Sequence, residues 1–297
     1  MGQKFDIVKL NFNAPLHISR GQTSNYDVSE RIIHSDTLKA ALFSVFKNLM
    51  HGETVEADED FHAQFKISSA FPFKGNELFF PKPMTKLPFD VSSQEDVKAA
   101  KKIKKIQYLD KESFESILND QAISFSTEQI SSNGQIYSSK PLSAQFKIMK
   151  SDVQQKVYVP NDPKEDSLPY YIDRIYFEKD AGLFFLLETE GESIKKKLMH
   201  CLNLLGDEGI GSDRNVGNGT FSYTTGQIYF DLPDQNAYET NLSLYLPQKK
   251  ELNKRDINKS SYQLMKRGGY IAGTNNPEFF QLRKRSIYMF TEASVFR

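Results

Sequence analysis

The chain has 297 residues, of which 39% are hydrophobic and 26% are charged, and its 38 basic side chains balance 38 acidic ones. This suits a globular protein with one large or two modest domains. The single cysteine, Cys201, excludes an intramolecular disulfide, and no stretch is long and apolar enough to span a bilayer as a helix. Because residues 1–12 also lack a signal-peptide core, we expect a cytoplasmic location and no membrane contact.

The charges are unevenly distributed along this neutral chain. Residues 249–297 hold eleven basic and four acidic side chains, a lysine cluster lies at 98–105, and an acidic run lies at 53–60. Local basic surfaces on a neutral protein indicate a polyanion that is bound at a few places. Solvated helix faces are the alternative explanation, above all for the lysines.

The first part of the chain predicts a strand followed by a helix. Residues 4–13 alternate in hydrophobicity, which is typical of a strand. Along 35–49 apolar side chains recur at spacings of three and four, which predicts an amphipathic helix with Ser35 as its N-cap. Residues 77–84 predict a short edge strand, because two prolines interrupt it. A further helix is predicted at 93–106.

The later part predicts a hairpin, a helix and a strand. Residues 170–178 and 182–188 are rich in β-forming residues, and the short turn between them predicts that they pair as a β-hairpin. An amphipathic helix follows over 193–205, with Gly206 as the residue that ends it. Residues 219–230 alternate into another strand. Together with the first strand and helix, these elements give the βαββαβ order of a ferredoxin-like fold.

The expected fold class is therefore α+β, with a ferredoxin-like (RRM-like) βαββαβ core. This core would occupy residues 1–232 and carry a large insertion at about 52–165. Residues 233–297 hold short β-forming runs and predict a smaller C-terminal α+β domain. We interpret this second domain as an abbreviated ferredoxin-like one.

One glycine-rich loop is the most informative segment of the chain. Residues 206–221 read GDEGIGSDRNVGNGTF and hold five glycines in sixteen positions. Glycines at this density permit positive φ angles and let backbone N–H groups approach a ligand closely. Ser212, Arg214 and Asn215 add donors suited to phosphates or base edges. The loop predicts a polyanion site, and a mobile surface loop is the alternative.

Two familiar nucleotide-binding motifs do not fit this loop. No Gly-Lys-Ser/Thr follows the glycines, so it is not a Walker loop. A dinucleotide fingerprint requires strand, glycines and then helix, whereas here a helix precedes the glycines and a strand follows them. The scattered histidines and single cysteine also lack the spacing of metal ligands. We expect neither a metal nor a cofactor.

Two motifs together resemble a known family. LHISRG (16–21) and IHSDTLKAAL (33–42) follow the first strand, and GIGSDRNVGNGTF (209–221) lies near the end of the core. This combination resembles the RAMP superfamily of CRISPR systems, and most closely the family of the fourth Csm subunit in type III-A effector complexes. SLPYYIDRIYFEKDAGLFFL (167–186) is also similar to that family.

The resemblance implies a non-catalytic subunit that binds and caps the 5′ handle of the CRISPR RNA. It implies docking to the large polymerase-like Csm subunit on one side and to the backbone RAMP subunit on the other. It further implies a thumb-like excursion that contacts target RNA near the handle, for which 151–171 is the candidate. Related proteins often carry a basic residue there, where this chain has Asn161 and Asp162.

The expected RNA contacts come from the glycine loop and from the start of the 35–49 helix, whose positive dipole end and free N–H groups suit a phosphate. These two regions are expected to meet, since the first and last core strands lie side by side. The candidate RNA-binding residues are His17, Ser19, Arg20, His34, Ser35, Asp36, Gly209, Ile210, Gly211, Ser212, Arg214, Asn215, Gly217, Gly219 and Arg267.

Two other functions remain open. Some RAMP proteins are metal-independent endoribonucleases that process precursor CRISPR RNA, and His17 or His34 with Tyr26 would supply the general base and acid. A nucleotide-binding enzyme that uses the glycine loop is the other possibility, although the missing lysine argues against it. The large insertion and the predicted hairpin favour an effector subunit, so we predict no catalysis on this chain.

Overall fold

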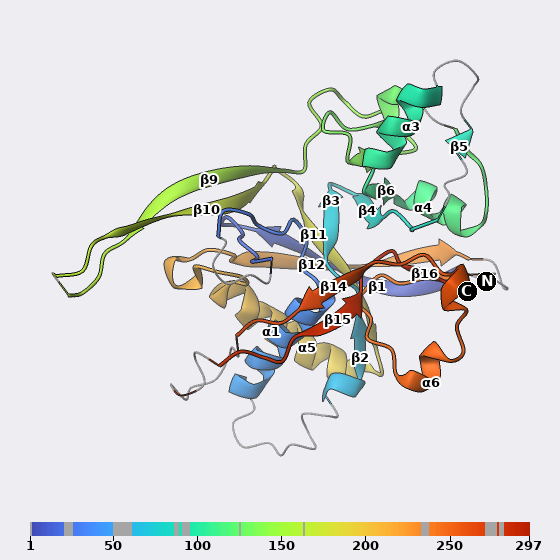
Figure 1. The fold of residues 1–297 in the computed structure, drawn as a ribbon. Coiled ribbons are helices and arrows are strands. Elements are labelled where there is room, and N and C mark those ends of the chain that lie inside the picture. The colour runs from blue at the N-terminus through green and yellow to red at the C-terminus, as the bar shows by residue number, and fades with distance from the viewer. Residues whose placement is uncertain are drawn as a thin grey trace.

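A large sheet organises the computed structural model (Figure 1), which describes residues 2–20, 26–49, 61–85, 89–90, 96–124, 126–162, 164–232, 238–270, 278 and 282–297. Its strands follow the order β12 (Phe221–Asp231), β1 (Gly2–Phe12), β11 (Ala181–Thr189), β3 (Phe71–Lys74), β4 (Glu77–Pro81), β6 (Tyr108–Asp110) and β8 (Ile136–Tyr137), and β2 (Phe65–Ile67) also pairs with β11. The acidic run predicted at 53–60 lies outside the described residues.

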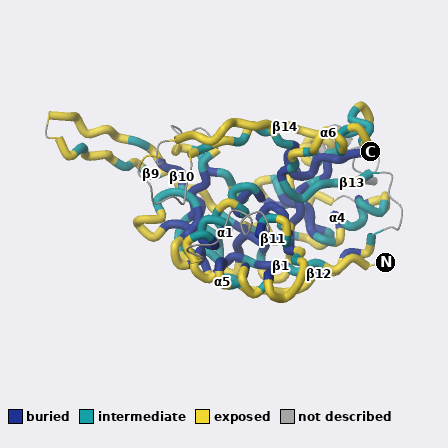
Figure 2. Tube along the Cα trace, turned by 90° about the horizontal axis from the view of Figure 1, so that it is seen from below, coloured by how far each residue is buried: buried dark blue, intermediate teal, exposed yellow. Residues whose placement is uncertain are grey.

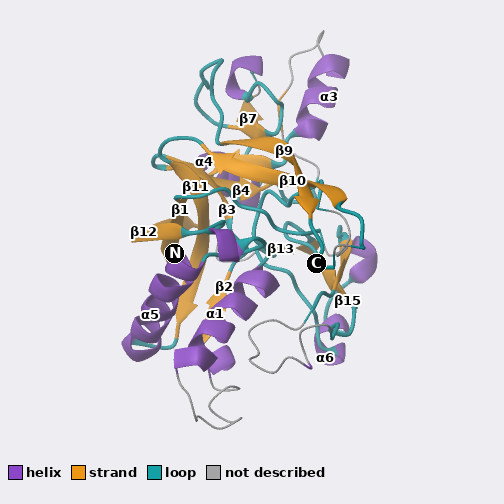
Figure 3. Ribbon diagram, turned by 90° about the vertical axis from the view of Figure 1, so that its left-hand side faces the viewer, coloured by secondary structure: helices purple, strands orange, loops and turns teal. Residues whose placement is uncertain are grey.

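Two helices cover one face of this sheet, and smaller elements lie at its far end (Figures 1 and 3). The covering pair is α1 (Ser35–Leu49) and α5 (Glu192–Glu208). Further described elements are α3 (Asp96–Lys105), α4 (Lys111–Leu118), β5 (Phe89–Asp90), β7 (Ile123–Ser124), β13 (Glu239–Thr240), α6 (Lys249–Leu252), β14 (Leu264–Arg267), β15 (Ile287–Phe290) and β16 (Val295–Phe296). None of the helices in the described ranges is both long and apolar enough to cross a bilayer.

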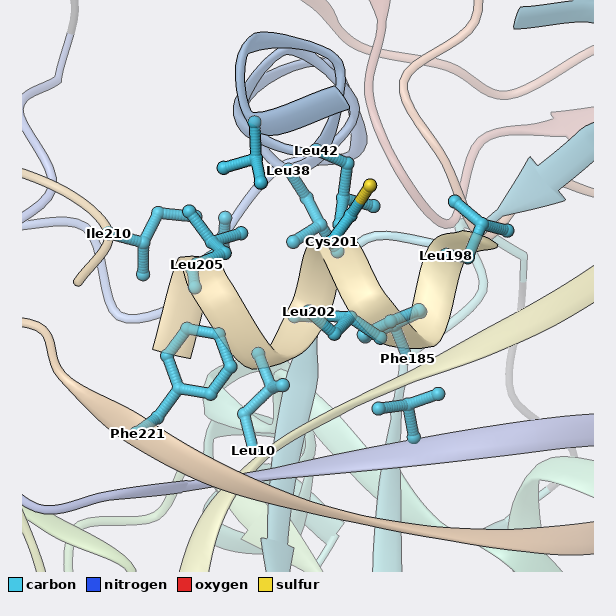
Figure 4. Close-up of a cluster of buried hydrophobic side chains, with 14 of the residues drawn as sticks. Leu10, Leu38, Leu42, Phe185, Leu198, Cys201, Leu202, Leu205, Ile210 and Phe221 are labelled. Carbon is cyan, nitrogen blue, oxygen red and sulfur yellow. The ribbon is translucent and has the colours of Figure 1, made fainter. Parts of the chain in front are cut away.

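The apolar stripes of α1 and α5 form the core against β1, β11 and β12. In Figure 4, α5 lies between α1 and the sheet residues Leu10 and Phe221, and Cys201 lies on the side of α5 that faces α1. The predicted helix at 35–49 and the first strand are confirmed. Burial raises the pKa of the Cys201 thiol to about 11, which suits a small buried side chain rather than a nucleophile.

The predicted pairing of 170–178 with 182–188 is wrong. β10 (Leu168–Phe177) pairs with β9 (Met149–Tyr158) along ten positions, whereas β11 pairs with β1, β2 and β3. The physical reason is burial. Seven consecutive residues of β11, from Ala181 to Leu187, are buried, and such a run requires a strand covered on both faces. The outer residues of β10, Leu168, Pro169 and Tyr171, are exposed, which fits a two-stranded ribbon.

Two smaller predictions are also wrong. β4 is not an edge strand, because it pairs with β3 on one side and β6 on the other. Pro81 is its last residue and Pro83 lies outside it, so neither proline interrupts the strand. Gly206 does not end α5, which continues to Glu208 and is capped by Gly209 at φ 80°. Gly206 instead lets the helix approach β12 closely, since a Cβ there would lie 2.4 Å from the Phe221 carbonyl oxygen.

The β9–β10 ribbon extends far from the body of the protein (Figures 1 and 2). It contains most of the predicted excursion at 151–171. Its base is fixed because Ile172 and Ile175 are buried and Leu16 pairs with Ile175. Its outer half exposes apolar side chains, namely Val153, Val157, Tyr158, Val159, Leu168 and Tyr171. An exposed apolar ribbon of this kind indicates a surface that contacts another molecule.

Candidate functional site

The glycine loop follows α5 and is folded against the chain itself. The Ile210 N–H donates to the Gly219 carbonyl at 3.0 Å, which joins the two arms of the loop. The Ser212 N–H donates to the His17 carbonyl at 3.0 Å, and the Gly219 N–H donates to the Pro15 carbonyl at 2.9 Å. The glycine loop therefore lies against Pro15 and His17 after the first strand, whereas the start of the 35–49 helix, which was expected to meet the loop, contacts Ser69 and Leu244.

Most of the loop glycines provide room for the protein rather than for a ligand. Gly211 has a φ of 97°, and a Cβ there would lie 2.3 Å from the His17 carbonyl oxygen. Gly209 and Gly219 are equally crowded by backbone, and Ile210 is buried in the core. The idea that these glycines leave space for RNA is wrong for all three. Gly217, at φ 82°, faces open space.

The exposed part of the loop is its tip. Arg214–Val216 form a short 3-10 turn that Gly217 closes. The Arg214 side chain is 47% exposed, and Asn215 and Gly217 are exposed as well. Ser212 is half-buried. Arg214 and Asn215 are thus the loop side chains best placed to donate hydrogen bonds to a ligand in solvent.

Asp213 connects the loop tip to both strands of the ribbon. One carboxylate oxygen, Oδ2, accepts from Lys156 Nζ of β9 at 2.8 Å and from Arg174 Nη2 of β10 at 3.4 Å. Burial alone would raise the pKa of this carboxyl, but the hydrogen bonds and positive charges of Lys156 and Arg174 hold it below its ordinary value. The residue adopts φ 59°, a left-handed conformation that aspartate tolerates.

His17 belongs to the buried support of this junction. Its side chain is fully buried, and Nδ1 lies 2.7 Å from the Asp173 carbonyl oxygen. Since a carbonyl only accepts, Nδ1 donates in this pair. Ser19 is half-buried and bridges to Ser29, whereas Arg20 is 57% exposed, with Nε 3.4 Å from Glu30 Oε1. Of the three candidates in this segment, Arg20 is the exposed one.

The start of α1 is covered by the C-terminal segment of the chain. His34 Nδ1 lies 2.8 Å from Glu292 Oε1, and Ser69 Oγ donates to the same oxygen. The Ser35 N–H donates to Ser69 Oγ at 2.8 Å. Ser35 does not cap its own helix, because its hydroxyl accepts from the Leu244 N–H at 3.0 Å. At the predicted phosphate site, His34 and Ser35 are thus buried and hydrogen-bonded within the protein, while Asp36 is half-buried.

Arg267 is also part of this internal contact. Its Nε and Nη2 lie 2.8 and 2.9 Å from the two carboxylate oxygens of Asp36, and Nη2 is 2.9 Å from Thr37 Oγ1. Such a bidentate pair is geometrically specific. The Arg267 side chain is only 11% exposed. It was predicted to face RNA in a turn, but it packs against α1.

The geometry gives little support to an acid–base pair. The rings of His17 and Tyr26 lie 6.0 Å apart, but the His17 side chain is fully buried and His34 is only 3% exposed. A general base must reach the proton that it removes. Across the described ranges, no group of three or more His, Cys, Asp or Glu side chains is arranged to hold a metal ion.

The sequence analysis missed the residues that hold these surfaces together. Lys156, Arg174 and Glu292 were not singled out, and Asp213 was passed over within the loop. Only Asp213 carried a local signal, because an aspartate among glycines is suited to a positive φ. The partners of all four lie 39 to 258 positions away along the chain. Such pairs follow from the tertiary fold.

Comparisons with known proteins agree with one another. A profile of the CRISPR Csm4 C-terminal domain matches residues 234–297. A relative from Mycobacterium tuberculosis, "CRISPR system Cms protein Csm4", is 31% identical over 265 residues, which cover 88% of this chain and 79% of the relative. A Thermococcus onnurineus protein of the same name is 25% identical over 264 residues, with coverages of 86% and 81%.

Solved structures have the same fold. The chain aligns to one in the crystal structure of the Csm3-Csm4 subcomplex of the type III-A CRISPR-Cas interference complex, with a TM-score of 0.64 and 21% identity over 99% of this chain and 92% of that one. A chain of the Csm1-Csm4 cassette in complex with pppApA gives a TM-score of 0.62 at 21% identity, with coverages of 99% and 87%. The mixed α+β fold with one large sheet is thereby confirmed.

Two loop glycines should respond differently to alanine. Gly211→Ala places a Cβ against the His17 carbonyl at a positive φ, so we expect a loss of about 3 kcal/mol in the free energy of unfolding. Gly217→Ala meets open space and should lose about 1 kcal/mol from the positive φ alone. Urea denaturation of both variants measures this, and equal losses would show that Gly211 is not packed as described.

Glu292 should stabilise the fold in a pH-dependent way. Burial alone would raise its pKa, but hydrogen bonds from His34 and Ser69 lower it below the ordinary 4.5. A lowered folded pKa means that the ionised carboxylate stabilises the protein above pH 4.5, and that this contribution is lost as the pH falls through the folded value. Glu292→Gln should therefore cost about 3 kcal/mol at pH 7.

The difference between wild type and Glu292→Gln should shrink in denaturation experiments below pH 4.5. Glu165→Gln, at the exposed ribbon tip, is the control and should change the free energy of unfolding by less than about 0.5 kcal/mol. A Glu292→Gln penalty that stays constant from pH 7 to well below pH 4.5 would contradict this assignment.

Proposed function

The chain belongs to the Csm4 family of type III-A CRISPR subunits, and we propose that in such a complex it binds and caps the 5′ handle of the CRISPR RNA without catalysing a reaction. Family membership confirms the resemblance that the two motifs indicated. The handle contact, the linking role and the absence of catalysis are the proposed parts.

One observation supports the handle contact most directly. Asp213 joins the exposed loop tip to both strands of the ribbon, so that Arg214 and Asn215 are presented beside a projecting two-stranded arm. Single-stranded RNA is recognised by contacts to its backbone and to splayed bases, and both need donors on an accessible and fixed surface. Arg214 suits a phosphate, and Asn215 suits a phosphate or a base edge. Arg20 is a further exposed cation in the segment next to the loop.

The ribbon is the proposed thumb, which contacts target RNA next to the handle. Its ten-residue strands place the tip far from the sheet, and its outer half is exposed and partly apolar. Apolar and aromatic side chains can wedge against bases or stack on them. The earlier candidate range, 151–171, lies within the larger span of 149–177 that the strands define.

We also propose that the chain links the large polymerase-like subunit to the backbone RAMP subunit. The supporting facts are that its structural relatives occur in a Csm3-Csm4 subcomplex and a Csm1-Csm4 cassette. The order β12–β1–β11–β2, with α1 and α5 on one face, supports a ferredoxin-like core within residues 1–232. The insertion would then begin after β3, because β2 and β3 pair with β11. Residues 233–297 form the proposed second domain, whose ferredoxin-like character stays a prediction.

A native purification of the tagged chain from its host tests this function. Copurified RNA is sequenced, and proteins are identified by mass spectrometry. Mature CRISPR RNAs that share one 5′ handle, together with the polymerase-like and backbone subunits, are the expected result. Recovery of the chain alone with repeat fragments would contradict the proposal and favour the endoribonuclease.

Arg214→Ala should weaken binding of handle RNA, because it removes an exposed charge-assisted donor from the loop tip. We expect a loss of about 1–3 kcal/mol in binding free energy, measured by fluorescence anisotropy with labelled handle RNA. Lys197→Ala removes one exposed charge from α5 and is the matched control. If both variants lose affinity equally, the loss reflects net charge and not the loop tip.

A further inference from the structure

We propose that Tyr26 and Tyr170 form a stacking site for one unpaired nucleobase on the β9–β10 ribbon, where Tyr170 pairs with Lys156. The two rings lie 6.1 Å apart, centroid to centroid, at an interplanar angle of 61°. Tyr26 is 40% exposed and Tyr170 is half-buried. This inference rests on the proposed function, because it requires that the chain binds RNA.

Tyr26 is held in place although it is exposed. Its ring contacts two neighbouring rings, Tyr170 at 6.1 Å and the fully buried His17 at 6.0 Å. Its carbonyl accepts from the Asp173 N–H at 2.8 Å, which fixes its backbone to β10. An exposed aromatic ring with a fixed orientation loses little conformational entropy on binding. It is therefore a good stacking platform.

The tyrosine pair lies on the same side of the ribbon as the glycine loop. Tyr170 stands directly opposite Lys156 in the β9–β10 register, so their side chains share one face. Lys156 in turn contacts Asp213 at 2.8 Å, next to the exposed Arg214. A phosphate bound by the loop tip would thus have an aromatic platform near it for an adjacent base. Donors to the RNA phosphates combined with rings that stack on bases are typical of single-stranded RNA sites.

A nucleobase fits the local charges better than a peptide segment does. Lys156 and Arg174 both point to the Asp213 carboxylate, which holds the two cationic side chains within the protein. Stacking needs no charge partner, because every base presents a π face. Tyr171 supplies the internal comparison. It is 54% exposed but lies on the opposite ribbon face, where Gln155 is its cross-strand partner.

The test uses the reconstituted effector complex and guide RNAs that carry 2-aminopurine at successive handle positions, since stacking quenches its fluorescence. One position should be quenched in wild type and in Tyr26→Phe, and that quenching should be lost in Tyr26→Ala. The isolated chain should bind handle RNA about 5- to 100-fold more weakly as Tyr26→Ala, and near wild-type affinity should return in Tyr26→Phe. Tyr171→Ala is the control and should leave both readouts unchanged.

Each other outcome identifies what has failed. Retained quenching and affinity in Tyr26→Ala would overturn the stacking site while leaving RNA binding intact. Equal losses in Tyr26→Ala and Tyr171→Ala would assign the effect to the ribbon as a whole. Loss of subunit assembly with unchanged RNA affinity would make Tyr26 a protein contact. If the wild-type chain binds no handle RNA, the proposed function fails together with this inference.

Discussion

The proposed RNA-facing surface depends on the carboxylate of Asp213. It holds one cation from each strand of the ribbon while its own backbone forms the tip of the glycine loop. This contact brings together segments that lie about 40 to 60 positions apart along the chain. It also holds Lys156 and Arg174 in the interior contact, whereas Arg214 and Arg20 remain exposed, 4.0 Å from Glu208 and 3.4 Å from Glu30. The ribbon and the loop are thereby presented as one surface.

A second constraint acts at the start of α1, where the protein's own carboxylates occupy the positive end of the helix. Asp36 pairs with Arg267, and Glu292 pairs with His34 and Ser69. These contacts fix the C-terminal segment to the core strands through a helix terminus that would otherwise suit an external anion. The motif at 33–42 therefore stabilises the fold, while the motif at 209–221 contributes both packing and an exposed tip.

The sequence predicted the elements better than their partners. Hydrophobic periodicity identified α1, α5, β1 and β12 closely, because each buries one regular face. The predicted pairing of β10 with β11 was wrong, because it rested on their adjacency along the chain. Adjacency does not show that β9, at 149–158, is the partner of β10. The glycine loop was correctly found, but glycine density does not reveal whether backbone or ligand fills the space. The burial of His17 and His34, which the sequence does not reveal, shows that both side chains support the fold.

Site-resolved crosslinking tests the central claim most directly. A reconstituted complex with 4-thiouridine in the guide handle is irradiated, and the crosslinked peptides of this chain are identified by mass spectrometry. Handle nucleotides should crosslink to peptides that contain the loop tip at 212–217 and the ribbon residues 170–174. Crosslinks confined to the outer surfaces of α1 and α5, or to the C-terminal segment at 282–297, would contradict the account.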